Sequence, residues 1–152
     1  MDLQTIAEGI KATGMVRVVR TNEHGVIVEE RNVKNLVVTT GKNYIASKMV
    51  ATTNSPVSMT HMGIGTGTAT PAIGDTALSG QTARAALTGS AVSGNAITYT
   101  ATFNPGVGDG AITEAGIFNA STSGTMLCRT TFPVVNKGSG DTITITWVVT
   151  VS

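Results

Sequence analysis

The second half of the chain alternates between apolar and polar residues with the period of two that is typical of β-strands. In residues 142–151, Ile145, Trp147 and Val149 fall on one face and threonines fill most of the other. The pattern predicts strands over residues 83–90, 96–103, 112–118, 125–132 and 142–151. The apolar faces of these strands predict a core that includes Ile97, Tyr99, Phe103, Phe118, Ile145, Trp147 and Val149.

The first third of the chain predicts a β-hairpin followed by one short helix. Residues 15–20 and 26–31 are apolar and charged segments on either side of residues 21–25, where Gly25 suits a turn position with positive φ. The period then changes over residues 39–50, which predicts a helix with Thr40 as its N-cap. Residues 1–14 are expected to form an arm, and residues 59–65 a further strand.

These elements predict an all-β fold, an antiparallel β-sandwich of jelly-roll type with an N-terminal arm and hairpin and one short helix. The composition shifts near residue 55. We therefore expect an N-terminal part over residues 1–54, packed on the core or reaching beyond it, and a sandwich domain over residues 55–152.

Composition and charge narrow the possible partners. The chain has 10 Lys and Arg against 9 Asp and Glu, a net charge of +1. Binding to nucleic acid requires a clustered basic face, which so small a net charge does not indicate. Acidic residues near the N-terminus and the lack of a long apolar run lead us to expect cytoplasmic synthesis in the host and no membrane partner. One cysteine and two histidines favour neither a disulfide nor a metal site.

The sequence offers weak candidates for catalysis or cofactor binding. Residues 63–68 (GIGTGT) are glycine-rich, but no helix signal or Gly-Lys-Ser/Thr motif follows, so we expect a tight loop and no phosphate site. His24, His61 and Cys128 lack a catalytic context. We expect no catalytic residues and no cofactor. An enzyme remains an alternative only if Asp109, Glu114 and Asp141 share one cleft.

Two surface features admit both a structural and a functional interpretation. The threonine faces fit solvated sheet, or a sugar-binding or ice-binding face, although few aromatic residues are available for stacking on sugars. The predicted hairpin carries charges of both signs, which fit either weak ion pairs in solvent or a contact between subunits. As candidate assembly contacts we take Arg17, Arg20, Glu29, Glu30, Arg31 and Lys34.

Four segments together resemble a known family. They are residues 35–46 (NLVVTTGKNYIA), 61–68 (HMGIGTGT), 112–119 (ITEAGIFN), and the run from Asn136 through Trp147. In this order they resemble small virion structural proteins of tailed bacteriophages, over residues 15–152. The resemblance carries no catalytic motif.

The resemblance implies a non-enzymatic structural protein of the virion. The expected function is capsid decoration: a cement protein on the capsid surface that binds the major capsid protein at local symmetry axes. The alternative is a tail-fibre or baseplate adaptor, or a receptor-binding component, with tail or baseplate proteins as partners. A homotrimer is the oligomeric state that the resemblance implies.

Overall fold

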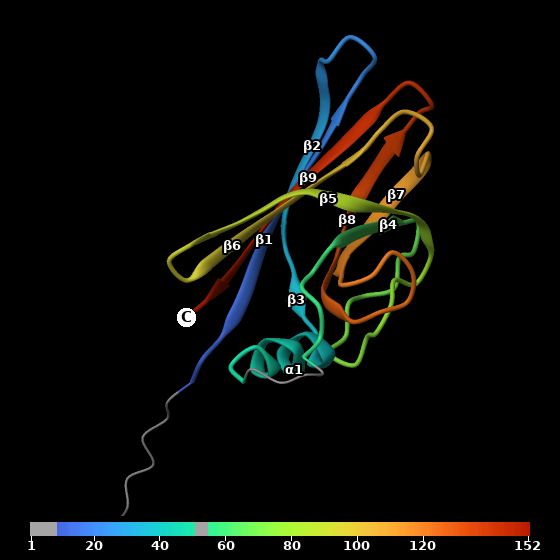
Figure 1. The fold of residues 1–152 in the computed structure, drawn as a ribbon. Helices are drawn as coiled ribbons and strands as arrows, with labels where there is room; N and C mark the ends of the chain where they lie inside the picture. Colours follow the sequence, from blue (N-terminus) through green and yellow to red (C-terminus); the bar gives the residue numbers. More distant parts are fainter. Residues whose placement is uncertain (1–8, 51–54) are drawn as a thin grey trace, which may run out of the picture.

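The computed structural model describes residues 9–50 and 55–152, and within them the protein is all-β with one short helix (Figure 1). The elements are β1 (Ala12–Thr21), β2 (Ile27–Lys34), β3 (Leu36–Val37), α1 (Thr39–Ser47), β4 (His61–Gly65), β5 (Gln81–Ser93), β6 (Ala96–Phe103), β7 (Gly110–Phe118), β8 (Met126–Lys137) and β9 (Thr142–Val151). All strand pairs are antiparallel. The predicted antiparallel β-sandwich is confirmed.

The strands form one folded-over sheet in the order β2-β1-β9-β6-β5-β4-β7-β8-β3. β5 belongs to both layers, because its residues 81–86 pair with β4 and its residues 87–93 pair with β6. A register shift between Leu87 and Gly89 lies where β5 changes partner. The long strand β5 thus crosses from one layer of the sandwich to the other (Figure 1).

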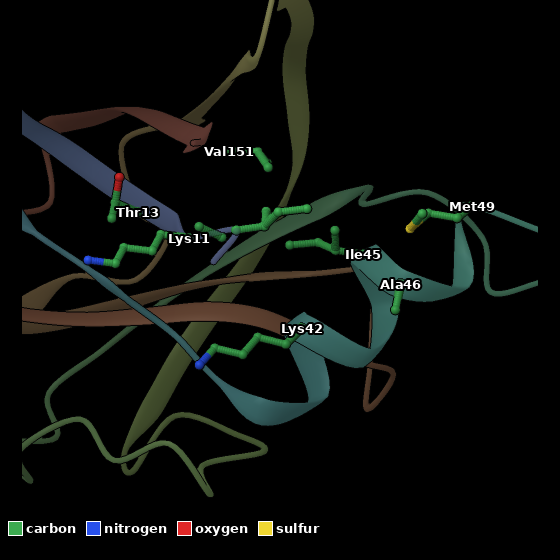
Figure 2. Close-up of a pocket in the computed structure, with 9 residues that line it drawn as sticks. Lys11, Thr13, Lys42, Ile45, Ala46, Met49 and Val151 are labelled. Carbon is green, nitrogen blue, oxygen red and sulfur yellow. The ribbon is translucent and has the colours of Figure 1, made fainter. Parts of the chain in front are cut away.

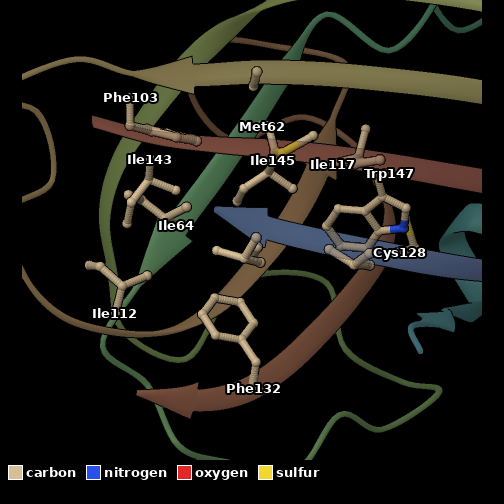
Figure 3. Packing of buried hydrophobic residues seen from close by; sticks show 14 of the residues in the cluster. Met62, Ile64, Phe103, Ile112, Ile117, Cys128, Phe132, Ile143, Ile145 and Trp147 are labelled. Carbon is tan, nitrogen blue, oxygen red and sulfur yellow. The ribbon is translucent and has the colours of Figure 1, made fainter. Parts of the chain in front are cut away.

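The main core fills the space between the two layers (Figure 3). Ile145 and Trp147 of β9 and Phe103 of β6 are fully buried, as are Met62 of β4 and Ile117 of β7. The seven positions expected in the core are not equivalent. Phe103, Ile145, Trp147 and Val149 lie in the main cluster, Phe118 lies in a second cluster, and Ile97 and Tyr99 are only partly buried.

The predicted hairpin is confirmed, with Gly25 at a φ of 74° in its turn. β1 starts at Ala12, so residues 12–14, which were expected in the arm, pair with β9 instead. Residues 1–8 of the arm lie outside the described residues, as do residues 51–54 beside the expected division of the chain.

Helix α1 ends at Ser47 rather than at residue 50. The prediction of Thr40 as the N-cap was wrong: Val38 occupies that position, and the Thr40 hydroxyl donates to the Met126 carbonyl at 2.9 Å. A Cβ on Gly41 would lie 1.9 Å from the Leu127 carbonyl oxygen, so this glycine lets α1 pack directly on β8. Among the described residues, no helix is long and apolar enough to cross a membrane.

Candidate functional site

The most buried ion pair of the described structure joins Glu114 on β7 to Arg129 on the neighbouring β8. Their side chains are 0% and 2% exposed, and Arg129 Nη2 lies 2.9 Å from Glu114 Oε2. A second contact joins Arg129 Nε to the same oxygen at 3.3 Å. Because a buried charge without a partner is very costly, each of these residues depends on the other.

Glu114 and Arg129 together hold the long loop between β4 and β5. The Glu114 carboxylate accepts hydrogen bonds from the backbone N–H groups of Gly67, Ser79 and Gly80, at 3.1, 3.0 and 2.6 Å. Arg129 donates to the Ala69 carbonyl and to Asp75 Oδ2, both at 2.8 Å. The loop between residues 66 and 80 is therefore fastened at both of its ends and in its middle.

This network explains the glycine-rich segment 63–68. A Cβ on Gly67 would lie 1.8 Å from the Ser79 hydroxyl and 2.5 Å from Glu114 Oε1, so only glycine fits. Backbone N–H groups of such loops commonly bind an anion, and here they bind a carboxylate of the chain itself. Residues 63–65 end strand β4, and only residues 66–68 form the tight loop that the sequence predicts.

The same contacts shift the pKa values of two carboxyl groups. Burial raises the pKa of Glu114, but the hydrogen bonds from Arg129, Gly80 and Ser79 outweigh it and leave the pKa below its usual value. The pKa of Asp75 is also lowered, first by the backbone N–H of Ala72 and then by Arg129. Both groups are held as carboxylates at neutral pH.

The three acids proposed as a possible catalytic group are each paired with a different cation. Glu114 pairs with Arg129, Asp109 Oδ1 lies 2.6 Å from Lys137 Nζ, and Asp141 Oδ2 lies 2.8 Å from Arg20 Nη1. Within residues 9–50 and 55–152, no group of three His, Cys, Asp or Glu side chains is arranged to hold a metal ion. The observed pairs fix loops and strand ends.

The other residues considered for chemistry have structural surroundings. Cys128 is fully buried, and this burial raises the pKa of its thiol. His61 Nδ1 lies 2.8 Å from the Thr60 hydroxyl, and His24 is exposed beside Glu23 in the hairpin turn. None of these side chains is aligned with another as a nucleophile and its base.

The charged residues predicted as assembly contacts lie on the β1–β2 hairpin, where most of them pair with one another. Arg17 and Glu30 form an exposed ion pair of 2.7 Å. Arg20 is less exposed and contacts both Glu29, at 3.0 Å, and Asp141, at 2.8 Å. The hairpin is thereby joined to the turn between β8 and β9.

Arg31 of the edge strand β2 reaches across to β8, beyond the part of β8 that pairs with β3. Its Nε and Nη2 donate to the carbonyls of Pro133 and Val134 on β8, at 3.3 and 2.9 Å. A side chain thus satisfies edge carbonyls that backbone N–H groups would bond in a closed barrel. Lys34 is exposed near the end of β2.

Sequence reasoning missed the apolar side chains near the hairpin turn. Val26 and Ile27 are each 54% exposed and Val28 is 42% exposed. The signal was available, because three consecutive β-branched residues break the alternation of one buried and one exposed face. The turn of the hairpin extends past the other strands at this end of the molecule (Figure 1).

The threonines of β6 and β9 lie on the outer face of the sandwich. Thr100 pairs with Thr146 and Thr102 with Thr144, and all four are partly buried by their neighbours. Neither β6 nor β9 contains a charged residue. The result is a continuous, uncharged face across two adjacent strands.

The fold defines an antiparallel β-sandwich protein in which paired charges hold loops and strand ends together. Residues 30–152 match the family described as phage tail-collar fibre protein, N-terminal, and the chain belongs to this family. It is a structural protein of the tailed-phage virion, of tail-fibre type, and the predicted resemblance is confirmed. No curated protein and no solved structure matches the chain.

The family match changes which of the two functional interpretations is favoured. It supports the tail-fibre alternative better than capsid decoration, and it supports a virion location without placing the protein on the capsid surface. The matched range begins within β2, so β1 and the hairpin turn precede it.

Proposed function

We propose that this chain joins a fibre to the tail or baseplate of the phage, as a non-enzymatic component that needs no cofactor. The observation that carries this proposal is the family match over residues 30–152. The partners are then tail or baseplate proteins in place of the major capsid protein. The paired acids support the absence of catalysis, because each one already serves a structural contact.

The hairpin is the contact surface that we assign to this function. Val26, Ile27 and Val28 supply exposed apolar area, and the ion pair between Arg17 and Glu30 lies on the same hairpin. An apolar centre with charged residues at its rim is the usual anatomy of a protein interface. In this assignment residues 1–54 provide the contact hairpin and residues 55–152 most of the sandwich.

Three copies around a common axis are the assembly that we propose for the fibre. The uncharged threonine face of β6 and β9 is suited to packing against another copy, since no charge has to be desolvated there. The molar mass of the purified protein, measured by light scattering, tests this part of the proposal. A molar mass equal to that of a monomer, even at high protein concentration, would contradict it.

Electron microscopy of virions labelled with an antibody against the protein tests the proposed location. We expect label at the tail and a low copy number from the intensities of the virion protein bands. Label over the whole head, with copies in the number expected for a shell, would overturn the proposal in favour of capsid decoration.

A substitution in the hairpin tests the proposed contact surface. We expect Ile27→Asp to leave the protein folded and to reduce its incorporation into virions. The matched control is Ile73→Asp, because Ile73 is similarly exposed, at 61%, but lies in the loop between β4 and β5. Equal incorporation of both variants would exclude the hairpin as the attachment surface.

A further inference from the structure

An apolar groove lies at the end of the molecule where helix α1 meets the first residues of β1 and the last residues of β9 (Figure 2). Its volume is about 440 Å³. The apolar part of its lining consists of Ile10, Ala12, Ile45, Ala46, Met49 and Val151. We call this feature the α1 groove.

The α1 groove adjoins a second apolar hollow, which is lined by Tyr44, Ile45 and Lys48 of the same helix. This hollow has a volume of about 400 Å³ and shares Ile45 and Val151 with the α1 groove. Met49, Ile10 and Val92, which line the two, are 84%, 80% and 75% exposed. They are the most exposed large apolar side chains of the described residues, and all three lie at this end of the fold.

The charged side chains that line the α1 groove and the second hollow are all lysines. Lys11 and Lys42 line the groove, and Lys48 lines the second hollow. In the part of the chain that the structure describes, the ion pairs involve none of these three lysines. A segment that fits the groove should therefore combine apolar side chains with acidic ones.

We propose that residues 1–8 of the same chain occupy the α1 groove. Their sequence, MDLQTIAE, supplies the apolar residues Leu3 and Ile6 together with the acidic residues Asp2 and Glu8. Gly9 joins them directly to Ile10, which lines the groove. A segment tethered at the edge of its own binding site has a high effective concentration there, so few contacts suffice.

The position of Met49 in the α1 groove provides a direct readout. We would label the methionine methyl groups of the full chain with ¹³C and record their NMR signals. Leu3→Asp with Ile6→Asp should move the Met49 signal to its position in a chain that starts at Gly9. The signals of the buried Met62 and Met126 should stay where they are, which controls for unfolding.

Charge reversal distinguishes specific binding of residues 1–8 in the α1 groove from non-specific hydrophobic contact. Asp2→Lys with Glu8→Lys should displace the Met49 signal in the same direction, and adding Lys11→Glu with Lys42→Glu should return it toward the wild-type position. Thr5→Ser is the matched control and should leave the signal unchanged. A Met49 signal that is the same in the wild type and in all of these variants would overturn the proposal.

A mixing experiment distinguishes the same chain from a neighbouring one. Labelled protein that starts at Gly9 is mixed with unlabelled full chain. An unchanged Met49 signal supports binding within one chain. A shift toward the wild-type position would show that residues 1–8 fill the groove of a second copy and would overturn the assignment to the same chain.

Discussion

The guanidinium of Arg84 on β5 stacks on the ring of Phe118 on β7, with 3.6 Å between its central carbon and the ring centroid. Its Nη1 also donates to the carbonyls of Ala120 and Ser123, at 3.0 and 2.8 Å. A single side chain thereby attaches the turn between β7 and β8 to the sheet. Partial burial lowers the pKa of Arg84.

Replacing Arg84 should loosen this turn. We expect Arg84→Ala to reduce the free energy of unfolding by about 1–3 kcal/mol, because two carbonyls and an aromatic face lose their cationic partner. Urea denaturation measures the change, and hydrogen exchange at residues 119–125 locates it. Arg84→Lys retains the charge but not the forked geometry, so it should recover only part of the loss.

Removing one partner of the buried Glu114–Arg129 pair should destabilise the protein more than replacing both partners. Glu114→Ala removes the buried partner of Arg129 and leaves only the partly exposed Asp75 as its counter-ion, so we expect a loss of about 3–5 kcal/mol in the free energy of unfolding. Glu114→Leu combined with Arg129→Met should be less damaging than Glu114→Ala alone. The control, Glu30→Gln in the exposed pair, should change little. A double variant as unstable as the single one would contradict this account.

The pKa shifts of Glu114 and Asp75 predict that the free energy of unfolding depends on pH. Both pKa values lie below their ordinary values of 4.5 and 3.8, so the unfolded chain binds these protons more readily than the folded protein. Their contribution is present above the ordinary values and declines as pH falls through them and then through the lower folded values. Urea midpoints measured from about pH 7 down to about pH 3 should fall, and less steeply in Glu114→Gln.

The close contact around Gly67 predicts a specific intolerance to a side chain. Gly67→Ala should destabilise the protein by about 1–3 kcal/mol or prevent the loop from closing, because its Cβ overlaps the Ser79 hydroxyl. Gly74→Ala, in the same loop, is the matched control: nothing lies within 4 Å of its Cβ. Thermal melting compares the two. Equal melting temperatures would show that the loop can shift to accommodate the methyl group.

The sequence predicted strands accurately where one face of the strand lies in the core and the other on the outer surface. Residues 96–103 and 142–151 alternate except at Ala96 and Val148, and β6 and β9 have the predicted bounds. β8 runs on to Lys137, beyond the predicted end at residue 132, because Pro133 lies at a register shift where no ladder N–H is needed. Alternation alone does not reveal such an irregular position.

The buried ion pair was not predicted, although a signal exists. Glu114 and Arg129 are the only charged residues within the predicted strands 112–118 and 125–132. Both faces of β7 are buried, since Ala115 and Ile117 face the main core while Leu78 of the loop packs against Gly116 and Phe118. That coverage depends on the path of the loop, which local sequence patterns do not encode.

The pairing of β1 with β9 determines how the protein responds to a pulling force. Ala12 is opposite Val151 and Thr21 is opposite Thr142, so the two ends of the described chain leave from the same end of the ladder. Force applied between those ends would separate the strands like a zipper, one hydrogen bond at a time. Force applied between the hairpin turn and Ser152 would instead load all ten residue pairs in shear. A fibre held by its hairpin would therefore be anchored in the mechanically stronger direction.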